Sequence, residues 1–161
     1  ESNYKFDIMF TSVLLRAKRT GKLILKKMGQ EDLKTFENEA LNERNYGDLV
    51  GLNKDDARKK WGEDQVHKWR RSFDIAPPGG ESLKMTAERV LPYFEETILP
   101  LLKEKSEILV AAHGNSLRAL VMQLDKLNSD EVVKLEIPTG MPICYSINEH
   151  GQVKNKVLMK T

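Results

Sequence analysis

Four consecutive residues, His113-Gly114-Asn115-Ser116, have the types needed to bind an anion and move a proton. They follow a short apolar run, Ile108 to Ala112, which predicts a strand buried on both faces. The apolar residues after them are spaced like the inner face of a helix. In parallel α/β sheets, ligands bind beyond the carboxyl ends of the strands. His113 is therefore expected either to face a ligand or merely to close a turn, and position in a fold leaves both interpretations open.

The same turn indicates which ligand would fit. Gly114 allows a ligand to approach the backbone closely, and Asn115 or Ser116 could cap the helix. The free N–H groups at a helix start favour an anion. A phosphate group is therefore the expected ligand.

A second strand and helix near the start of the chain would carry an arginine to the same place. Residues 6–10 predict a strand, Thr11-Ser12 a helix N-cap, and the apolar spacing over 14–28 an amphipathic helix. Arg16 lies in its first turn, where the helix dipole favours acids. It is either a solvated surface residue or a bidentate phosphate ligand beside His113.

The middle of the chain holds a further polar cluster. Residues 30–40 predict a connection or short helix, and residues 41–53 an ordered loop, which is where functional residues concentrate. The loop contains Glu43, Arg44 and Tyr46, an acid, a bidentate donor and a phenol. Clusters of this kind are also common on surfaces, so this one is weak support for a site by itself.

Two short helices follow the loop. Asn53 should cap a helix that runs to Trp61, and a second helix should bury Val66, Trp69 and Phe73. Arg70 and Arg71 lie between these apolar residues, which could be interpreted as a nucleic-acid patch. The nearby acids Glu63, Asp64 and Asp74 dilute that charge, so nucleic acid is the less favoured ligand.

The remaining elements complete an alternation of helices and strands. The sequence predicts a break at 76–80 and then a helix that opens at Glu81-Ser82, is kinked at Pro92 and ends or turns at Pro100. A further helix is expected over 130–135, capped by Ser129. Strands over 141–147 and 153–159 should form a hairpin.

Composition sets the class of protein. The chain has 161 residues, 40% hydrophobic and 31% charged, with a net charge of +2, which predicts one soluble domain over 1–161 and no strong attraction to nucleic acid. Its one cysteine fits a reducing cytoplasm, and no apolar run could span a membrane. No metal is expected, because His67 and His150 are isolated.

Five segments together resemble cofactor-dependent phosphoglycerate mutase, a family within the histidine phosphatase superfamily. They are T-S-V-L-L-R-A (11–17), L-N-E-R-N-Y-G-D-L-V-G-L-N-K (41–54), W-R-R-S-F-D-I (69–75), G-G-E-S-L (79–83) and A-A-H-G-N-S-L-R-A-L (111–120). The resemblance implies a three-layer α/β/α sandwich with a mostly parallel sheet. It implies interconversion of 3- and 2-phosphoglycerate in glycolysis and gluconeogenesis through a phosphohistidine primed by 2,3-bisphosphoglycerate. A small phosphorylated substrate is the expected partner, without membrane or nucleic acid, and the family allows a homodimer or homotetramer.

The resemblance also implies a role for each matched residue. Arg16 and His113 would bind the transferring phosphoryl group with the backbone of Gly114, and Glu43 would be the general acid/base. The substrate's carboxylate and second phosphate would be held by Arg44, Tyr46, Lys54, Arg70, Arg71 and Asn115. Asn45 stands where the loop often has a histidine, but these roles do not depend on it.

One part of the family pattern is not in the chain. The family's nucleophile is a histidine in an R-H-G motif at the end of its first strand, and these residues contain no R-H-G. We expect either that the first strand and helix are supplied from elsewhere or that the chain is catalytically incomplete. The alternatives to a mutase are a phosphatase of the same superfamily and a non-catalytic phosphate-binding remnant or assembly subunit.

Overall fold

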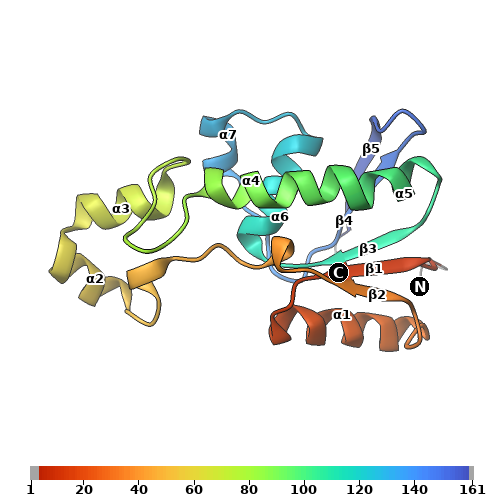
Figure 1. Ribbon diagram of the computed structural model, residues 1–161, viewed down its shortest axis with the longest axis horizontal. Helices are drawn as coiled ribbons and strands as arrows, with labels where there is room; N and C mark the ends of the chain where they lie inside the picture. The colour runs from red at the N-terminus through yellow and green to blue at the C-terminus, as the bar shows by residue number, and fades with distance from the viewer. Residues whose placement is uncertain (1–3, 160–161) are drawn as a thin grey trace.

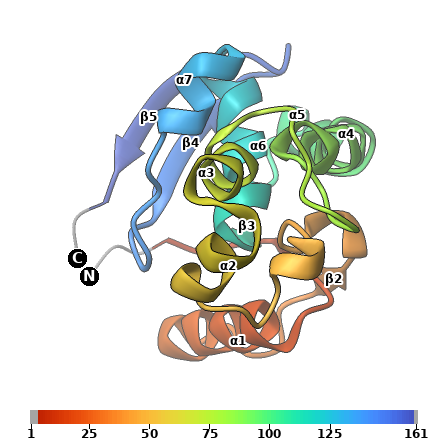
Figure 2. The ribbon, with the colours of Figure 1, turned by 90° about the vertical axis from the view of Figure 1, so that its left-hand side faces the viewer.

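A three-stranded parallel sheet with helices on both faces forms the centre of the molecule (Figure 1). The computed structural model describes residues 4–159. The strands are β1 (Ile8–Thr11), β2 (Thr35–Glu37) and β3 (Ile108–Ala111), in the order β2-β1-β3. Helix α1 (Leu15–Met28) covers one face, and α4 (Leu83–Tyr93) and α6 (Gly114–Leu124) cover the other (Figures 1 and 2). The predicted three-layer α/β/α arrangement is confirmed.

Helix α1 packs closely on β1 because it carries a glycine at the contact. Its buried stripe is Ala17, Gly21 and Leu25. A Cβ atom on Gly21 would lie 2.6 Å from the sulfur of Met9, so a larger residue there would require the Met9 side chain or the helix to shift. The helix ends at Gly29 in the left-handed conformation.

The main core lies on the opposite face of the sheet. It consists of Phe10, Leu41, Ala87, Val90, Phe94, Ile98, Ala119 and Leu120. Pro92 does not end α4: the chain continues as a π-helical turn, η3 (Phe94–Ile98), and then as α5 (Leu99–Lys103). Pro92 has no N–H to donate within the helix, and the wider π turn follows directly.

The segment between β2 and α4 extends away from the sheet. It contains two 3₁₀ turns, η1 (Glu39–Leu41) and η2 (Gly47–Leu49), and the helices α2 (Lys54–Trp61) and α3 (Glu63–Arg71), which project at one end of the molecule in Figure 1. Asn53 caps α2 as predicted. A second small core of Leu49, Ala57, Val66 and Trp69 holds this segment together.

The last strands form a separate sheet. After α7 (Ser129–Lys134), strands β4 (Ile143–Ile147) and β5 (Val153–Leu158) pair antiparallel as the predicted hairpin. The cap of α7 is Asn128 rather than the predicted Ser129. The helices of the described chain are each too short or too polar to cross a bilayer.

Two expectations about the sheet were wrong. Strand β2 was not predicted, because its three residues are all exposed and carry no apolar alternation. Strand β3 was predicted to be buried on both faces, but its first three residues are only half-buried. The reason is that, within residues 4–159, β3 pairs with β1 on one side and is the outer strand on the other.

Candidate active site

His113 stands where β3 ends and α6 begins. It is the N-cap residue of α6, in place of the predicted Asn115 or Ser116, and its side chain is 6% exposed. Its Nε2 lies 2.7 Å from the hydroxyl of Ser12, which follows β1. Ser12 also accepts a hydrogen bond from the Leu14 N–H, so it does not serve as the predicted cap of α1, whose N-cap is Leu14. This contact therefore joins the residues that follow the carboxyl ends of the neighbouring strands β1 and β3.

The anion that lies at the start of α6 is a side chain of the protein itself. Glu43 Oε1 accepts a 3.0 Å hydrogen bond from the Asn115 N–H and a 2.8 Å bond from the Arg44 N–H. Its other oxygen is 3.8 Å from where a Cβ on Gly114 would stand. The positive end of the helix thus fixes a carboxylate next to His113.

The side chain of Asn115 links three elements. Its amide nitrogen donates to the hydroxyl of Tyr46 at 3.3 Å, and its oxygen accepts from Arg118 at 3.0 Å. Arg118 donates in turn to the carbonyl of Leu135, after α7. Asn115 is consequently held in one orientation from both sides.

Arg44 is buried beneath the ring of Tyr46. It is 4% exposed, and its guanidinium lies 4.7 Å from the ring centroid. It donates to the carbonyls of Glu81 at 2.7 Å and Trp69 at 2.6 Å. Arg44 therefore joins the loop to α3 and the start of α4, besides placing a positive charge beneath the site.

The other predicted cations surround this centre at different depths. Arg70 lies 5.5 Å from the same Tyr46 ring, and its Nε is buried without a hydrogen-bond partner in the described structure. Arg16 is exposed in the first turn of α1. Lys54 opens α2 and Arg71 ends α3, and both are exposed on the projecting segment. The cluster of His113, Glu43, Arg44, Tyr46, Gly114 and Asn115 is thus compact, with Lys54 and Arg71 further out on the helices.

Burial and charge together set the protonation of His113. Burial lowers its pKa, and the nearby charge of Arg16 lowers it further, while the carboxylate of Glu43 acts in the opposite direction. Burial also lowers the pKa of Arg44, against the raising effect of Tyr46, Glu81 and Glu43. At neutral pH the imidazole is therefore uncharged, and the positive charge of the site lies on its arginines.

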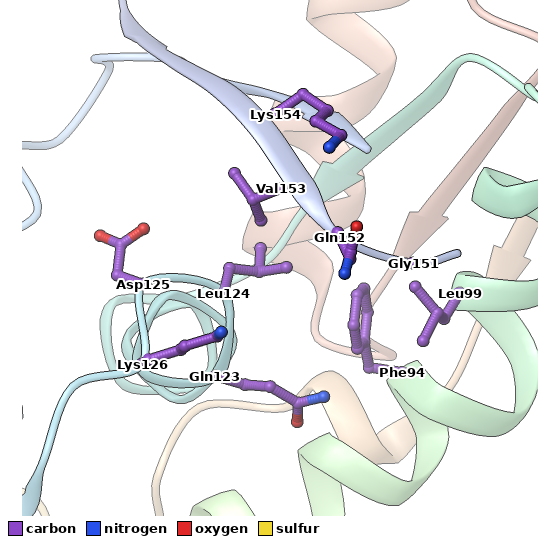
Figure 3. A pocket seen from close by; sticks show the side chains of 10 residues that line it. All are labelled: Phe94, Leu99, Gln123, Leu124, Asp125, Lys126, Gly151, Gln152, Val153 and Lys154. Atoms are coloured by element: carbon purple, nitrogen blue, oxygen red, sulfur yellow. The ribbon is translucent and has the colours of Figure 1, made fainter. Parts of the chain in front are cut away.

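A surface cavity within the described residues adjoins this cluster. It measures about 410 Å³ and is lined by Asn38, Glu39, Ala40, Asn42, Glu43, Asn45, Glu81 and Arg89. Another cavity, of about 570 Å³, lies at the other end of α6, between Phe94, Leu124 and Val153 (Figure 3). Eleven helical residues, roughly 16 Å, separate it from His113, so it does not belong to the same site.

Sequence patterns missed four residues that organise the cluster: Ser12, Glu81, Arg89 and Arg118. The sequence predicts Ser12 only as a helix cap, and Glu81 and Arg89 bind loop residues that lie 36 and 49 positions away. Arg118 lies within the H-G-N-S-L-R motif, one helical turn after Asn115, which is the only signal that could have found it. Within residues 4–159, no group of three or more His, Cys, Asp or Glu side chains is arranged to hold a metal ion.

Comparison with known families gives one match over nearly the whole chain. The model of the histidine phosphatase superfamily (branch 1) matches residues 2–158. A 2,3-bisphosphoglycerate-dependent phosphoglycerate mutase of Parvibaculum lavamentivorans is 62% identical over 96% of this chain and 73% of its own length. A phosphoglycerate mutase of Schizosaccharomyces pombe is 58% identical over 97% of this chain and 74% of its own.

Solved structures show the same fold at much lower identity. The alpha-ribazole phosphatase of Shigella flexneri has a TM-score of 0.78 at 22% identity, over 96% of this chain and 73% of its own. A mycobacterial glucosyl-3-phosphoglycerate phosphatase has a TM-score of 0.75 at 21% identity, over 97% and 76%. Fold is therefore shared with phosphatases, whereas high sequence identity is found with mutases.

Proposed function

Because this chain belongs to the histidine phosphatase superfamily, branch 1, we propose that it acts as a 2,3-bisphosphoglycerate-dependent phosphoglycerate mutase, which interconverts 3-phosphoglycerate and 2-phosphoglycerate. The observation that carries the proposal is the carboxylate of Glu43 fixed at the start of α6 beside His113. A proton-transfer group next to an anion site is what phosphoryl transfer to and from a substrate hydroxyl requires.

Each residue of the cluster has a part in this proposal. Arg16 and His113 hold the transferring phosphoryl group, with the backbone of Gly114, and Glu43 exchanges a proton with the substrate hydroxyl. The substrate's carboxylate and second phosphate are bound by Arg44, Tyr46, Lys54, Arg70, Arg71 and Asn115. Charge on the equatorial oxygens of the phosphoryl group is stabilised by such fixed donors.

One feature of Arg70 supports the proposal that a phosphorylated molecule binds here. The Nε of Arg70 is buried, points from α3 beside Tyr46, and has no hydrogen-bond partner in the described residues. A buried guanidinium N–H without a partner is unfavourable, and a carboxylate or phosphate oxygen would satisfy it. 2,3-Bisphosphoglycerate, when bound, would supply the phosphoryl group that primes the enzyme.

The nucleophile is proposed to come from outside residues 1–161. The sequence has no R-H-G motif, and of its three histidines His67 and His150 are exposed on α3 and in the hairpin turn. An edge of the parallel sheet leaves room for a further segment: in the described residues, β3 pairs with β1 only. An R-H-G strand that added to the free edge of β3 would end beside His113.

The test is an assay of residues 1–161 joined to an R-H-G segment, hereafter the complete enzyme. With 2,3-bisphosphoglycerate it should convert 3-phosphoglycerate into 2-phosphoglycerate, measured through a coupled enolase reaction, and should release little inorganic phosphate. Phosphate release without 2-phosphoglycerate would instead indicate the phosphatase alternative. Binding of phosphoglycerate with neither product would indicate a phosphate-binding remnant.

A further inference from the structure

Arg89 holds the loop that carries Glu43 through hydrogen bonds to the loop backbone. It projects from α4, and its side chain is 26% exposed. Its Nη1 donates to the carbonyl of Ala40 at 2.7 Å, and its Nη2 to the carbonyls of Asn42 at 3.0 Å and Glu43 at 3.2 Å. Three backbone acceptors of one short segment thus converge on a single guanidinium.

Glu81 pairs with Arg89 and also binds the backbone of the same loop. Its carboxylate accepts from Arg89 at 2.8 Å through Nε and 3.0 Å through Nη2, and from the Asn45 N–H at 2.9 Å. Burial alone would raise the pKa of Glu81, but these hydrogen bonds outweigh it and hold the pKa below its usual range. The ionised pair therefore fixes the backbone both before and after Glu43.

This support matters because the loop has little regular structure of its own. Between β2 and α2 only two 3₁₀ turns are present, so no helix or sheet ladder sets the position of Glu43. The carboxylate must still stay within hydrogen-bonding distance of the Asn115 N–H, on another element. A displacement of about 1 Å would break that contact, and misplacement on this scale can cost about 10²-fold in rate.

Resting on the proposed function, we propose that Arg89, paired with Glu81, is a positioning residue for the acid/base Glu43. It touches neither the substrate nor the reacting atoms, and it acts by holding the backbone of residues 40–43. A lysine could not replace it, because an ammonium has one nitrogen where the guanidinium offers a planar fork of donors. The cavity of about 410 Å³ beside Glu43, lined partly by Arg89 and Glu81, leaves this side of the loop unpacked within residues 4–159.

The kinetic test compares Arg89→Lys with Glu43→Gln in the complete enzyme. Arg89→Lys should lower kcat for 3-phosphoglycerate by roughly tenfold or more and change KM little. With p-nitrophenyl phosphate, whose leaving group needs no proton, the loss should be less than about threefold. In the Glu43→Gln background, Arg89→Lys should have almost no further effect, because the group that it positions is gone.

The matched control is Lys84→Met, which removes an exposed positive charge from the same helix and should leave both rates unchanged. Equal losses with the two substrates, or an undiminished loss in the Glu43→Gln background, would show that Arg89 is merely structural and overturn the inference.

A second measurement does not depend on turnover. Amide hydrogen exchange of Asn115 should become about tenfold faster or more in Arg89→Lys and in Glu81→Gln, and stay unchanged in Lys84→Met. Glu81→Gln keeps the size of the side chain, so it remains informative if an Arg89 variant does not fold. Unchanged exchange in both variants would refute the positioning role. Absence of mutase activity in the parent, with the exchange result as expected, would refute only the proposed function.

Discussion

The carboxylate of Glu43 accepts a 3.0 Å hydrogen bond from the backbone N–H of Asn115, although the two residues lie 72 positions apart in the chain. This bond holds a carboxylate, which we propose to be the acid/base, at the first turn of the helix that His113 begins. A carboxylate at this position can accept a proton from a substrate hydroxyl.

Replacing Glu43 by glutamine should therefore remove proton transfer and preserve most of the shape. In the complete enzyme, Glu43→Gln should lower kcat about 10²–10⁴-fold, with a much smaller change in KM, measured by steady-state kinetics. Asp48→Asn, at an exposed carboxylate of the same loop, serves as the control. A loss of less than about tenfold for Glu43→Gln would rule out the acid/base role.

The pKa of His113 should respond in opposite directions to its two charged neighbours. Arg16→Ala removes a charge that lowers the pKa, so the pKa should rise, and Glu43→Gln removes one that raises it, so the pKa should fall. Histidine NMR titration measures both.

The lowered pKa of His113 also makes the folding stability depend on pH. As pH falls below about 6.5, the unfolded chain takes up this proton before the folded one does, so folding stability should decrease. His113→Gln should lose that part of the pH dependence in denaturant titrations. If the variant kept the full dependence, other groups would be responsible.

Arg70 and Arg71 should bind substrate and not nucleic acid. Replacing both by alanine should raise KM for phosphoglycerate by roughly tenfold or more, because each hydrogen bond to a charged group is worth about 1.5–3 kcal/mol. Lys68→Ala, an exposed cation of the same helix, should leave KM unchanged. Salt-dependent retention of DNA by the parent protein would contradict this assignment.

Residues 1–161 alone should neither take up phosphate from 2,3-bisphosphoglycerate nor turn over 3-phosphoglycerate. A phosphohistidine needs an imidazole in line with the phosphoryl group, and His113 is proposed to donate hydrogen bonds to that group instead of attacking it. An R-H-G segment, fused or added in trans, should restore both reactions. Stoichiometric acid-labile radiolabel on the 161-residue chain alone would show that its nucleophile is already present.

Local sequence signals predicted most of the elements, because those signals act within one or two helical turns. Asn53 and Ser82 cap their helices as expected, since a side-chain oxygen needs only its own neighbourhood. The short strand β2 escaped prediction because it has only three residues, all exposed, and its one apolar contact, of Phe36 with Phe10, is with a strand distant in the sequence.

The site was predictable as a set of residue types but not as a set of contacts. The H-G-N-S motif and the loop around Glu43 were both visible in the sequence. The sequence did not show that the start of the helix in this motif binds the carboxylate of Glu43. The hydrogen bonds of Arg89 to residues 40–43 span nearly 50 positions, and that of Ser12 to His113 spans 101. No local periodicity carries information of that range.

The hairpin of β4 and β5 has a consequence for how the molecule opens. Isolated two-stranded hairpins are marginal in water, and this one is tied to the C-terminal end of α6 through Asp125, which accepts from Tyr145 at 2.9 Å and pairs with Lys156. Detachment of β4 and β5 would leave the contacts of His113 and Glu43 at the far end of α6 intact. We therefore expect the hairpin to open at a lower free energy than the central sheet, which would appear as faster amide hydrogen exchange in β4 and β5 than in β1 and β3.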